Sequence, residues 1–174
     1  MTPELSHSDW LVLGVLGGGA THGFAVSRSL AKDGDLGRIW SVRRPMVYQS
    51  VSKLTSLGLV AELASERSVS GPSRTPLELT AEGRSVLKDW LASPVEHLRD
   101  MRPLLLAKLA IVARLGLDPT PLLKAQRAQL TTMIDAQVDG ADEVERLVES
   151  WRVQVARAVL AFLDEQQETS RHPG

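Results

Sequence analysis

Residues 43–60 read Arg-Arg-Pro-Met-Val-Tyr-Gln-Ser-Val-Ser-Lys-Leu-Thr-Ser-Leu-Gly-Leu-Val and carry the clearest structural signal in the chain. Proline has a fixed φ and no N–H, so Pro45 suits the first turn of a helix. Gly58 follows the last periodic residue, where a left-handed C-cap is favoured. Apolar residues between them recur at helical spacing and predict one buried face: Val47, Val51, Leu54 and Leu57.

The polar residues of this stretch are of types that bind phosphates and base edges in DNA. We interpret the helix as the recognition helix of a winged helix-turn-helix. Residues expected to meet phosphates are Arg43, Arg44, Lys53 and, from the wing, Arg74, with Tyr48 donating a hydrogen bond to one. Gln49, Ser50 and Ser52 are the candidates for base edges. A solvated basic face, with Tyr48 packed on the wing, is the structural alternative.

Charge distribution supports this interpretation better than total charge does. The 174 residues carry a net charge of −1 and include no cysteine. No acidic residue lies between Asp35 and Glu62, whereas four basic residues do: Arg38, Arg43, Arg44 and Lys53. The lack of disulfides agrees with a reducing cytoplasm, where we place the protein. We expect no membrane association, because the apolar run 104–113 contains Lys108 and is too short to span a bilayer.

No enzyme is expected. The four histidines are far apart, so we predict no metal site, and no P-loop, dinucleotide glycine fingerprint or nucleophile elbow occurs. We expect no cofactor.

Two helices are predicted before the recognition helix. Ser8 is the expected N-cap of the first, which is apolar on most sides from Trp10 to Leu16 and therefore buried. Residues 21–23 are predicted to form a turn, followed by a second helix over 24–32. Its expected inward residues are Phe24, Val26, Leu30 and Ala31.

A two-stranded hairpin, the wing, is predicted after the recognition helix. Residues 60–68 alternate in polarity, 70–73 form a turn, and 74–79 form a returning strand. Pro76 cannot donate to a ladder, so we expect an edge strand. Thr80 should cap a helix over 81–91, with a domain boundary at Ser93-Pro94.

The second half is predicted to be helical, and therefore the fold is mainly α with a small β wing. The last helix, starting at Asp142, has a long apolar stripe whose core is Leu147, Trp151, Val155, Val159 and Phe162. We expect a homodimer through this stripe; the alternative is a helical hairpin within one chain that caps the N-terminal domain. The expected domains are 1–93 (winged helix-turn-helix), 94–168 (helical dimerisation) and 169–174 (disordered tail).

The order of these signals resembles the PadR family of bacterial transcriptional regulators. The matching segments are Leu13-Gly14-Val15-Leu16, His22-Gly23-Phe24, Val47-Tyr48, Leu57-Gly58-Leu59-Val60 and Leu79-Thr80-Ala81-Glu82-Gly83-Arg84. The helical tail, with Pro94-Val95-Glu96, is similar to the longer, virulence-activator-like branch. Two departures are Pro76-Leu77-Glu78, where the family carries an aromatic pair, and Arg43-Arg44-Pro45 in place of a small-residue turn.

The resemblance implies a dimeric winged-helix repressor or activator whose C-terminal helices form the dimer, and which can respond to a small aromatic effector. It places Tyr48 toward the DNA backbone, gives His22 and Gly23 a structural role, and puts Gly71, Ser73 and Arg74 at the wing tip. We expect binding to an inverted-repeat operator in double-stranded DNA, as a repressor. The rival function is a winged-helix module that binds only proteins. Trp40, Trp90 and Trp151 are expected in the core or dimer interface, or as walls of an effector pocket.

Overall fold

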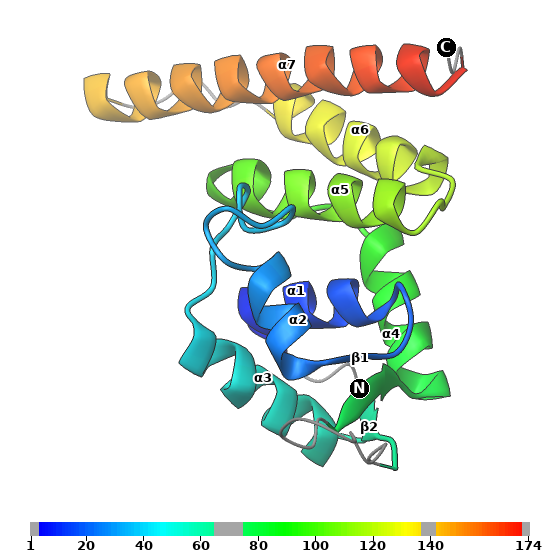
Figure 1. Cartoon of the computed structure of the whole chain (residues 1–174). Helices are drawn as coiled ribbons and strands as arrows, with labels where there is room; N and C mark the ends of the chain where they lie inside the picture. The colour runs from blue at the N-terminus through cyan, green and yellow to red at the C-terminus, as the bar shows by residue number, and fades with distance from the viewer. Residues whose placement is uncertain (1–3, 65–74, 137–141, 172–174) are drawn as a thin grey trace. The chain divides into compact units, whose positions relative to one another are not determined.

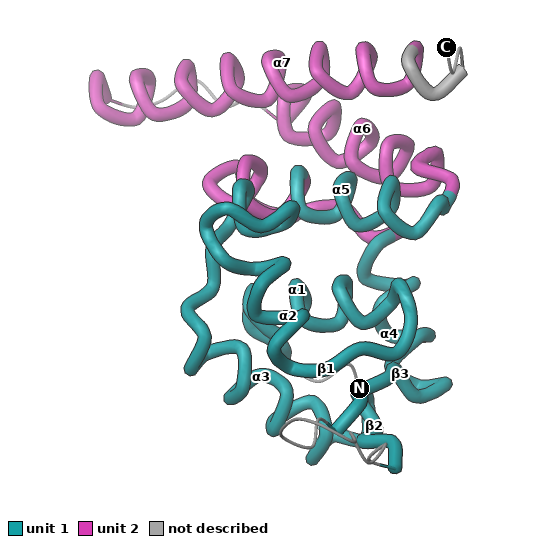
Figure 2. Tube along the Cα trace, viewed as in Figure 1, with its two compact units in different colours: residues 1–91, 106–117 teal, residues 92–105, 118–174 magenta. Residues whose placement is uncertain are grey.

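The computed structural model describes residues 4–64, 75–136 and 142–171 (Figure 1). The chain forms two compact units, one of residues 1–91 with 106–117 and one of residues 92–105 with 118–174 (Figure 2). The division near residue 92 lies beside the expected boundary at Ser93-Pro94. The return of residues 106–117 to the first unit is not visible in the sequence.

Helix α1 (His7–Leu16) is the centre of the first unit, and all its residues from Asp9 to Leu16 are buried. Its N-cap is Ser6 rather than the expected Ser8. The Ser6 hydroxyl accepts a hydrogen bond from the Asp9 backbone N–H at 3.3 Å, while the Asp9 carboxylate accepts one from the Ser6 N–H at 2.8 Å. This reciprocal capping box satisfies two helix-end donors and starts the helix two residues earlier than we predicted.

Helix α2 (Gly23–Ser29) is shorter than predicted, and its inward face is only partly as expected. Val26 and Leu30 are fully buried, but Phe24 is 43% exposed and Ala31 is also exposed. The prediction was wrong for these two residues because their orientation depends on where α2 meets α3, which the short apolar pattern does not specify.

Helix α3 (Arg44–Ser56) confirms the predicted helix, with Pro45 in its first turn. The buried residues Val47, Val51 and Leu54 pack in the core with α1 and α2. Gly58 adopts a φ of +71°, as the predicted C-cap requires. Leu57, expected inward, is 43% exposed.

The sheet has three antiparallel strands rather than two, in the order β1 (Thr21–His22), β3 (Pro76–Leu79), β2 (Val60–Glu62). The segment predicted as a turn is thus partly a strand, and β3 is central rather than an edge. Proline is tolerated because Pro76 is the first residue of β3 and lies opposite His22, where β1 ends. The wing residues Gly71, Ser73 and Arg74 lie outside the described residues.

Helix α4 (Ala81–Ala92) begins after Thr80, whose hydroxyl accepts the Gly83 N–H at 3.0 Å, confirming the predicted cap. Gly83 is required here because a Cβ at this position would lie 2.0 Å from the Leu59 carbonyl oxygen. Helix α5 (Leu106–Arg114) completes the first unit. It packs on α1, where a Cβ on Gly14 would lie 2.3 Å from the Ile111 side chain.

Lys108 on α5 is buried at 2% exposure. Its ammonium donates to the Trp90 carbonyl at 2.6 Å and lies 4.6 Å from the centroid of the Trp90 ring, which in turn stacks on Trp10. Burial lowers the pKa of Lys108 from its usual 10.5 to about 8. This lysine therefore joins α5 to α4 through polar and cation–π contacts.

The second unit is a helical assembly built from short helices at Leu98–Asp100 and Met101–Leu105, then α6 (Thr120–Asp135) and α7 (Glu143–Arg171). Buried Gln126 on α6 holds the segment before these helices, accepting from the Val95 N–H at 2.7 Å and donating to its carbonyl at 3.1 Å. Helix α7 starts next to Asp142, as predicted, and the Asp142 carboxylate accepts a hydrogen bond from the Glu145 N–H at 2.9 Å. Helix α7 continues to Arg171, into the expected disordered tail. None of the described helices combines the length and apolar composition needed to cross a membrane.

Candidate nucleic-acid interface

Six of the eight residues predicted to meet DNA are exposed on or beside α3. One of them, Lys53, pairs with Asp9, and the other five are Arg43, Arg44, Tyr48, Gln49 and Ser52. They lie opposite the buried stripe because 3.6 residues complete one helical turn. Together they present two guanidinium groups, a phenol, an amide and a hydroxyl on one accessible surface.

Tyr48 lies against the start of α2 rather than simply in solvent. A Cβ on Gly23 would come 2.9 Å from the Tyr48 ring, so only glycine permits this approach. The ring remains 43% exposed. This contact defines the position of the phenol and gives Gly23 a structural role, in agreement with what the family resemblance implies.

Arg44 is held by two aromatic rings. Its guanidinium carbon lies 5.4 Å from the centroid of Phe24 and 5.7 Å from that of Tyr48. Cation–π attraction of this kind restricts a long side chain and leaves its N–H groups available to an anion. The exposure of Phe24, which the sequence did not predict, therefore allows its ring to contact the Arg44 guanidinium at this surface.

Ser50 does not belong to the exposed face, contrary to the sequence-based expectation. Its residue is only 4% exposed and lies on the buried side of α3. Its side chain hydrogen-bonds to the Asp9 carboxylate. A small hydroxyl can replace an apolar residue on a helix face when it finds such a partner, so the polarity of Ser50 was misleading.

The Lys53 side chain binds residues at the start of α1 and just before it. Its ammonium lies 2.8 Å from the Asp9 carboxylate and 3.0 Å from the Glu4 carbonyl oxygen. Burial alone would raise the pKa of Asp9, but hydrogen bonds from Lys53, Ser50 and Ser6 outweigh it and lower this pKa. Lys53 thus joins α3 to the start of α1, while its side chain remains 44% exposed, and the DNA role predicted for it stays a prediction.

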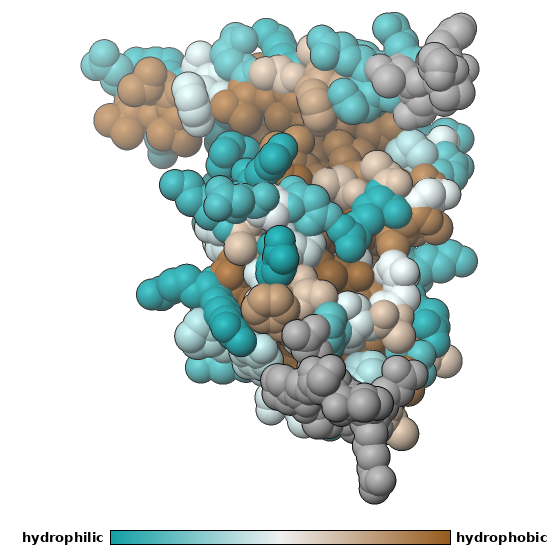
Figure 3. Space-filling view, viewed as in Figure 1, coloured by the Kyte–Doolittle hydropathy of each residue, from teal (hydrophilic) through white to brown (hydrophobic). Residues whose placement is uncertain are grey.

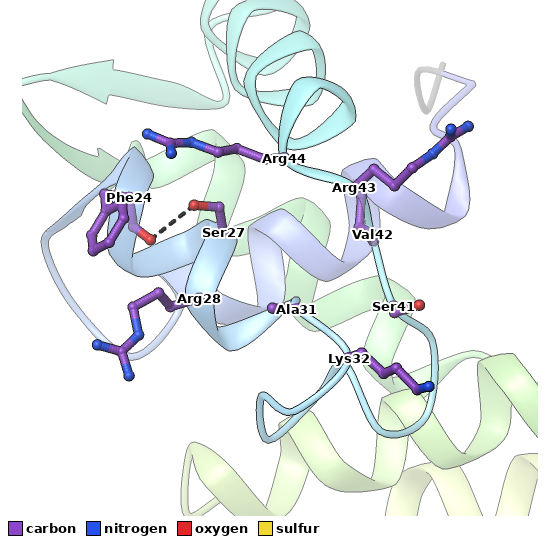
Figure 4. A pocket seen from close by; sticks show the side chains of 9 residues that line it. All are labelled: Phe24, Ser27, Arg28, Ala31, Lys32, Ser41, Val42, Arg43 and Arg44. Atoms are coloured by element: carbon purple, nitrogen blue, oxygen red, sulfur yellow. Dashed lines mark hydrogen bonds between the residues drawn. The ribbon is translucent and has the colours of Figure 1, made fainter.

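A basic pocket of about 400 Å³ lies between α2 and the residues that enter α3 (Figure 4). Arg28 and Lys32, which were not among the predicted DNA-binding residues, share its lining with Arg43 and Arg44. Their spacing of four residues, opposite buried Val26 and Leu30, is the signal that could have identified them. Figure 4 shows the Phe24 ring between the Arg44 and Arg28 side chains, while Arg43 and Lys32 extend from the opposite flank.

The predicted dimerisation residues divide into two groups on α7. Leu147 and Trp151 are 70% and 71% exposed, whereas Val155, Val159 and Phe162 are half-buried. The face of α7 that packs within its unit instead buries Val153, Ala156 and Leu163. Figure 3 shows the resulting apolar surface near the α7 end that begins at Glu143. Of the other tryptophans, Trp40 is 41% exposed and makes an edge contact with His7.

Among the described residues, no group of three or more histidine or carboxylate side chains could hold a metal ion.

No known family profile and no curated protein match the sequence. Among solved structures, Bacillus subtilis PadR in complex with operator DNA has a TM-score of 0.47 at 18% identity, covering 90% of this chain and 95% of that one. The same protein in complex with p-coumaric acid has a TM-score of 0.46 at 16% identity, with 96% and 100% covered. The smu.1604c protein of Streptococcus mutans UA159 has a TM-score of 0.45 at 12% identity, with 92% and 98% covered.

Proposed function

We propose that this protein is a PadR-like, DNA-binding transcriptional regulator that binds an inverted-repeat operator as a homodimer. The observation that carries the proposal is the exposed face of α3, where Arg44, Tyr48 and Gln49 are held beside a three-stranded sheet in a winged helix-turn-helix arrangement. The sequence motifs of the PadR family lie in the same elements. A recognition helix of this kind enters the major groove and contacts base edges.

The residues divide by chemistry. Arg43 and Arg44 would bind phosphates, because guanidinium groups pair with phosphate oxygens and stay charged at any physiological pH. Tyr48 would donate its hydroxyl to another phosphate. Gln49 and Ser52 are the candidates for base edges, because each can both donate and accept hydrogen bonds.

The homodimer is supported by the apolar stripe of α7. Leu147 and Val159 flank six further members of the stripe that are spaced alternately four and three residues apart: Val144, Val148, Trp151, Val155, Ala158 and Phe162. This heptad pattern is typical of helices that pair along their length. A twofold dimer would place two α3 helices in successive major grooves roughly 34–36 Å apart, which is why the operator should be an inverted repeat.

Repression is the expected outcome where such an operator overlaps a promoter. A small aromatic effector, implied by the family resemblance, would act by weakening operator binding. The corresponding test is the loss of operator binding on addition of a phenolic acid, with a non-aromatic acid of equal charge as control.

The proposal is tested by selecting bound fragments from genomic DNA and measuring their binding by fluorescence anisotropy. The selected duplex and a scrambled duplex are compared at about 50 and 200 mM salt. We expect tight binding to the selected duplex that falls steeply with salt, because each phosphate contact releases counterions. Equal, weak binding to both duplexes after selection would favour the alternative function, a winged-helix module that contacts only proteins.

A further inference from the structure

The basic pocket is built by α2 and by residues that enter α3. Arg28 projects from α2 and Lys32 from the turn that follows this helix, while Arg43 and Arg44 stand at the start of α3, so the four cations come from two separate segments. Val42, buried at 5% exposure, contributes to the apolar part of the lining. The volume of about 400 Å³ exceeds what a water molecule needs and can admit a phosphate group.

The pocket is strongly positive. It contains no acidic residue in its lining. Among the residues that the structure describes, none of the four cations has a carboxylate partner within 4 Å. Asp35, in the loop after α2, is bound instead by Arg114 and by the Ser29 hydroxyl. The positive potential of the pocket is therefore not neutralised by any carboxylate among residues 4–64, 75–136 and 142–171.

The local surroundings strengthen this potential. Apolar groups such as Phe24 and Val42 lower the effective dielectric constant around the cations. The N-terminus of α3 adds the positive end of a helix dipole, and no acidic residue occupies its first turn. Both effects favour a bound anion over water.

We infer that this pocket binds a backbone phosphate of DNA, next to the bases contacted by α3, with Arg28 and Lys32 as phosphate-binding residues. The inference rests on the proposed function. We favour a phosphate of DNA over a free anion because the pocket adjoins the α3 surface that is proposed to bind DNA. Arg44 lines the pocket and also contacts the Tyr48 ring, so its guanidinium is part of both surfaces. A phosphate in the pocket would extend the contact from the groove to the neighbouring strand.

The experiment uses the double variant Arg28→Ala/Lys32→Ala. Its matched control is Arg84→Ala/Lys88→Ala, which removes the same two residue types at the same spacing from exposed positions on α4. Anisotropy is measured across a salt series on the selected operator and on a scrambled duplex. Circular dichroism melting verifies that both variants fold.

We expect the pocket variant to bind both duplexes more weakly by a similar factor. Loss of one phosphate contact per subunit should reduce the slope of log affinity against log salt by roughly 2 per dimer and lower affinity tens-fold near 0.1 M salt. The control should keep the slope of the unaltered protein. A pocket variant with an unchanged slope would overturn the inference while leaving the proposed function intact.

A second measurement locates the phosphate. Single methylphosphonate substitutions, which remove one backbone charge, are scanned along the operator. We expect one phosphate per half-site whose neutralisation weakens the unaltered protein but not the pocket variant. Binding of inorganic phosphate by the unaltered protein, combined with equal sensitivity of both proteins to every substitution, would assign the pocket to a free anion instead. Absence of any selective DNA binding by the unaltered protein would overturn the proposed function and this inference together.

Discussion

The residues of α3 are expected to act differently on DNA although they share one surface. Arg44 is fixed between two rings and offers a charge, which attracts phosphates irrespective of sequence. Gln49 is exposed and offers an amide, whose paired donor and acceptor match adenine. Affinity and specificity should therefore be separable by single substitutions.

We predict that Arg44→Ala weakens binding to all duplexes alike, whereas Gln49→Ala relaxes preference at one base position. The second change should cost about 1–3 kcal/mol of discrimination at that position. Binding to a panel of operator duplexes with single base-pair changes measures both effects. Identical profiles for the two variants would contradict this division of roles.

The Asp9–Lys53 pair should stabilise the fold rather than the complex with DNA. We predict that Lys53→Met lowers the free energy of unfolding by about 1–2 kcal/mol, less than for a fully buried pair because solvent screens the half-exposed Lys53. Lys88→Met, on an exposed position of α4, is the control. Urea denaturation measures the change, and equal stability of the two variants would argue against it.

The same pair has a defined pH dependence. Because the pKa of Asp9 is lowered in the folded state, its contribution is present above the ordinary value of 3.8 and is lost as the pH falls below it. Asp9→Asn should remove this part of the acid sensitivity.

At the scale of elements, the contact between α4 and α5 depends on a buried cation. The Lys108 ammonium is removed from water and donates a hydrogen bond to the Trp90 carbonyl. Its burial lowers the pKa of Lys108 to about 8. Between this value and the ordinary 10.5, the unfolded chain binds more protons than the folded one. Stability must therefore rise with pH across that window.

We predict that the free energy of unfolding increases between about pH 8 and pH 10.5, by ~2–3 kcal/mol at most. Lys108→Met, which retains the length and apolar character of the side chain, should lack this increase. Urea denaturation at stepped pH measures the difference between the two proteins. Parallel pH profiles would show that Lys108 keeps its ordinary protonation in the folded state.

At the scale of the whole molecule, the apolar end of α7 is the most conspicuous surface. Val144, Leu147, Val148 and Trp151 are each at least 50% exposed in a single chain. A contiguous apolar surface of this kind usually marks an interaction site. Its heptad spacing favours a second copy of the chain as partner.

We predict that Leu147→Glu/Trp151→Glu converts the dimer to a monomer, because burying two carboxylates at a helix interface is strongly unfavourable. Gln154→Glu, which adds one charge at an exposed position off the stripe, is the control and should remain dimeric. Sedimentation velocity distinguishes the two. The monomer should also bind a half-site as well as it binds the full operator. A double variant that stays dimeric would exclude this surface as the interface.

Local sequence patterns were sufficient wherever the determining contacts lie within a few residues. The apolar spacing and Gly58 predicted α3 correctly, and the caps at Thr80 and Asp142 follow from side chains that bond three residues ahead. These features depend on helix geometry alone, which the spacing of residue types encodes directly. The same logic located helix α7 (Glu143–Arg171), whose dimerisation stripe stays a prediction.

Only the tertiary structure decided features that depend on contacts between distant segments. Lys53 and Asp9 are 44 residues apart, and β1 exists only because Thr21 and His22 pair with β3. Ser50 lies on the buried side of α3, where its hydroxyl helps to lower the pKa of Asp9, and Arg28 becomes part of a basic pocket because α2 ends beside the start of α3. A polar side chain alone does not reveal whether its partner is water, DNA or another part of the chain. The partner of such a side chain depends on which donor or acceptor the folded chain brings within hydrogen-bond distance. The spacing of residue types along the sequence does not specify distances between segments that are far apart in the chain.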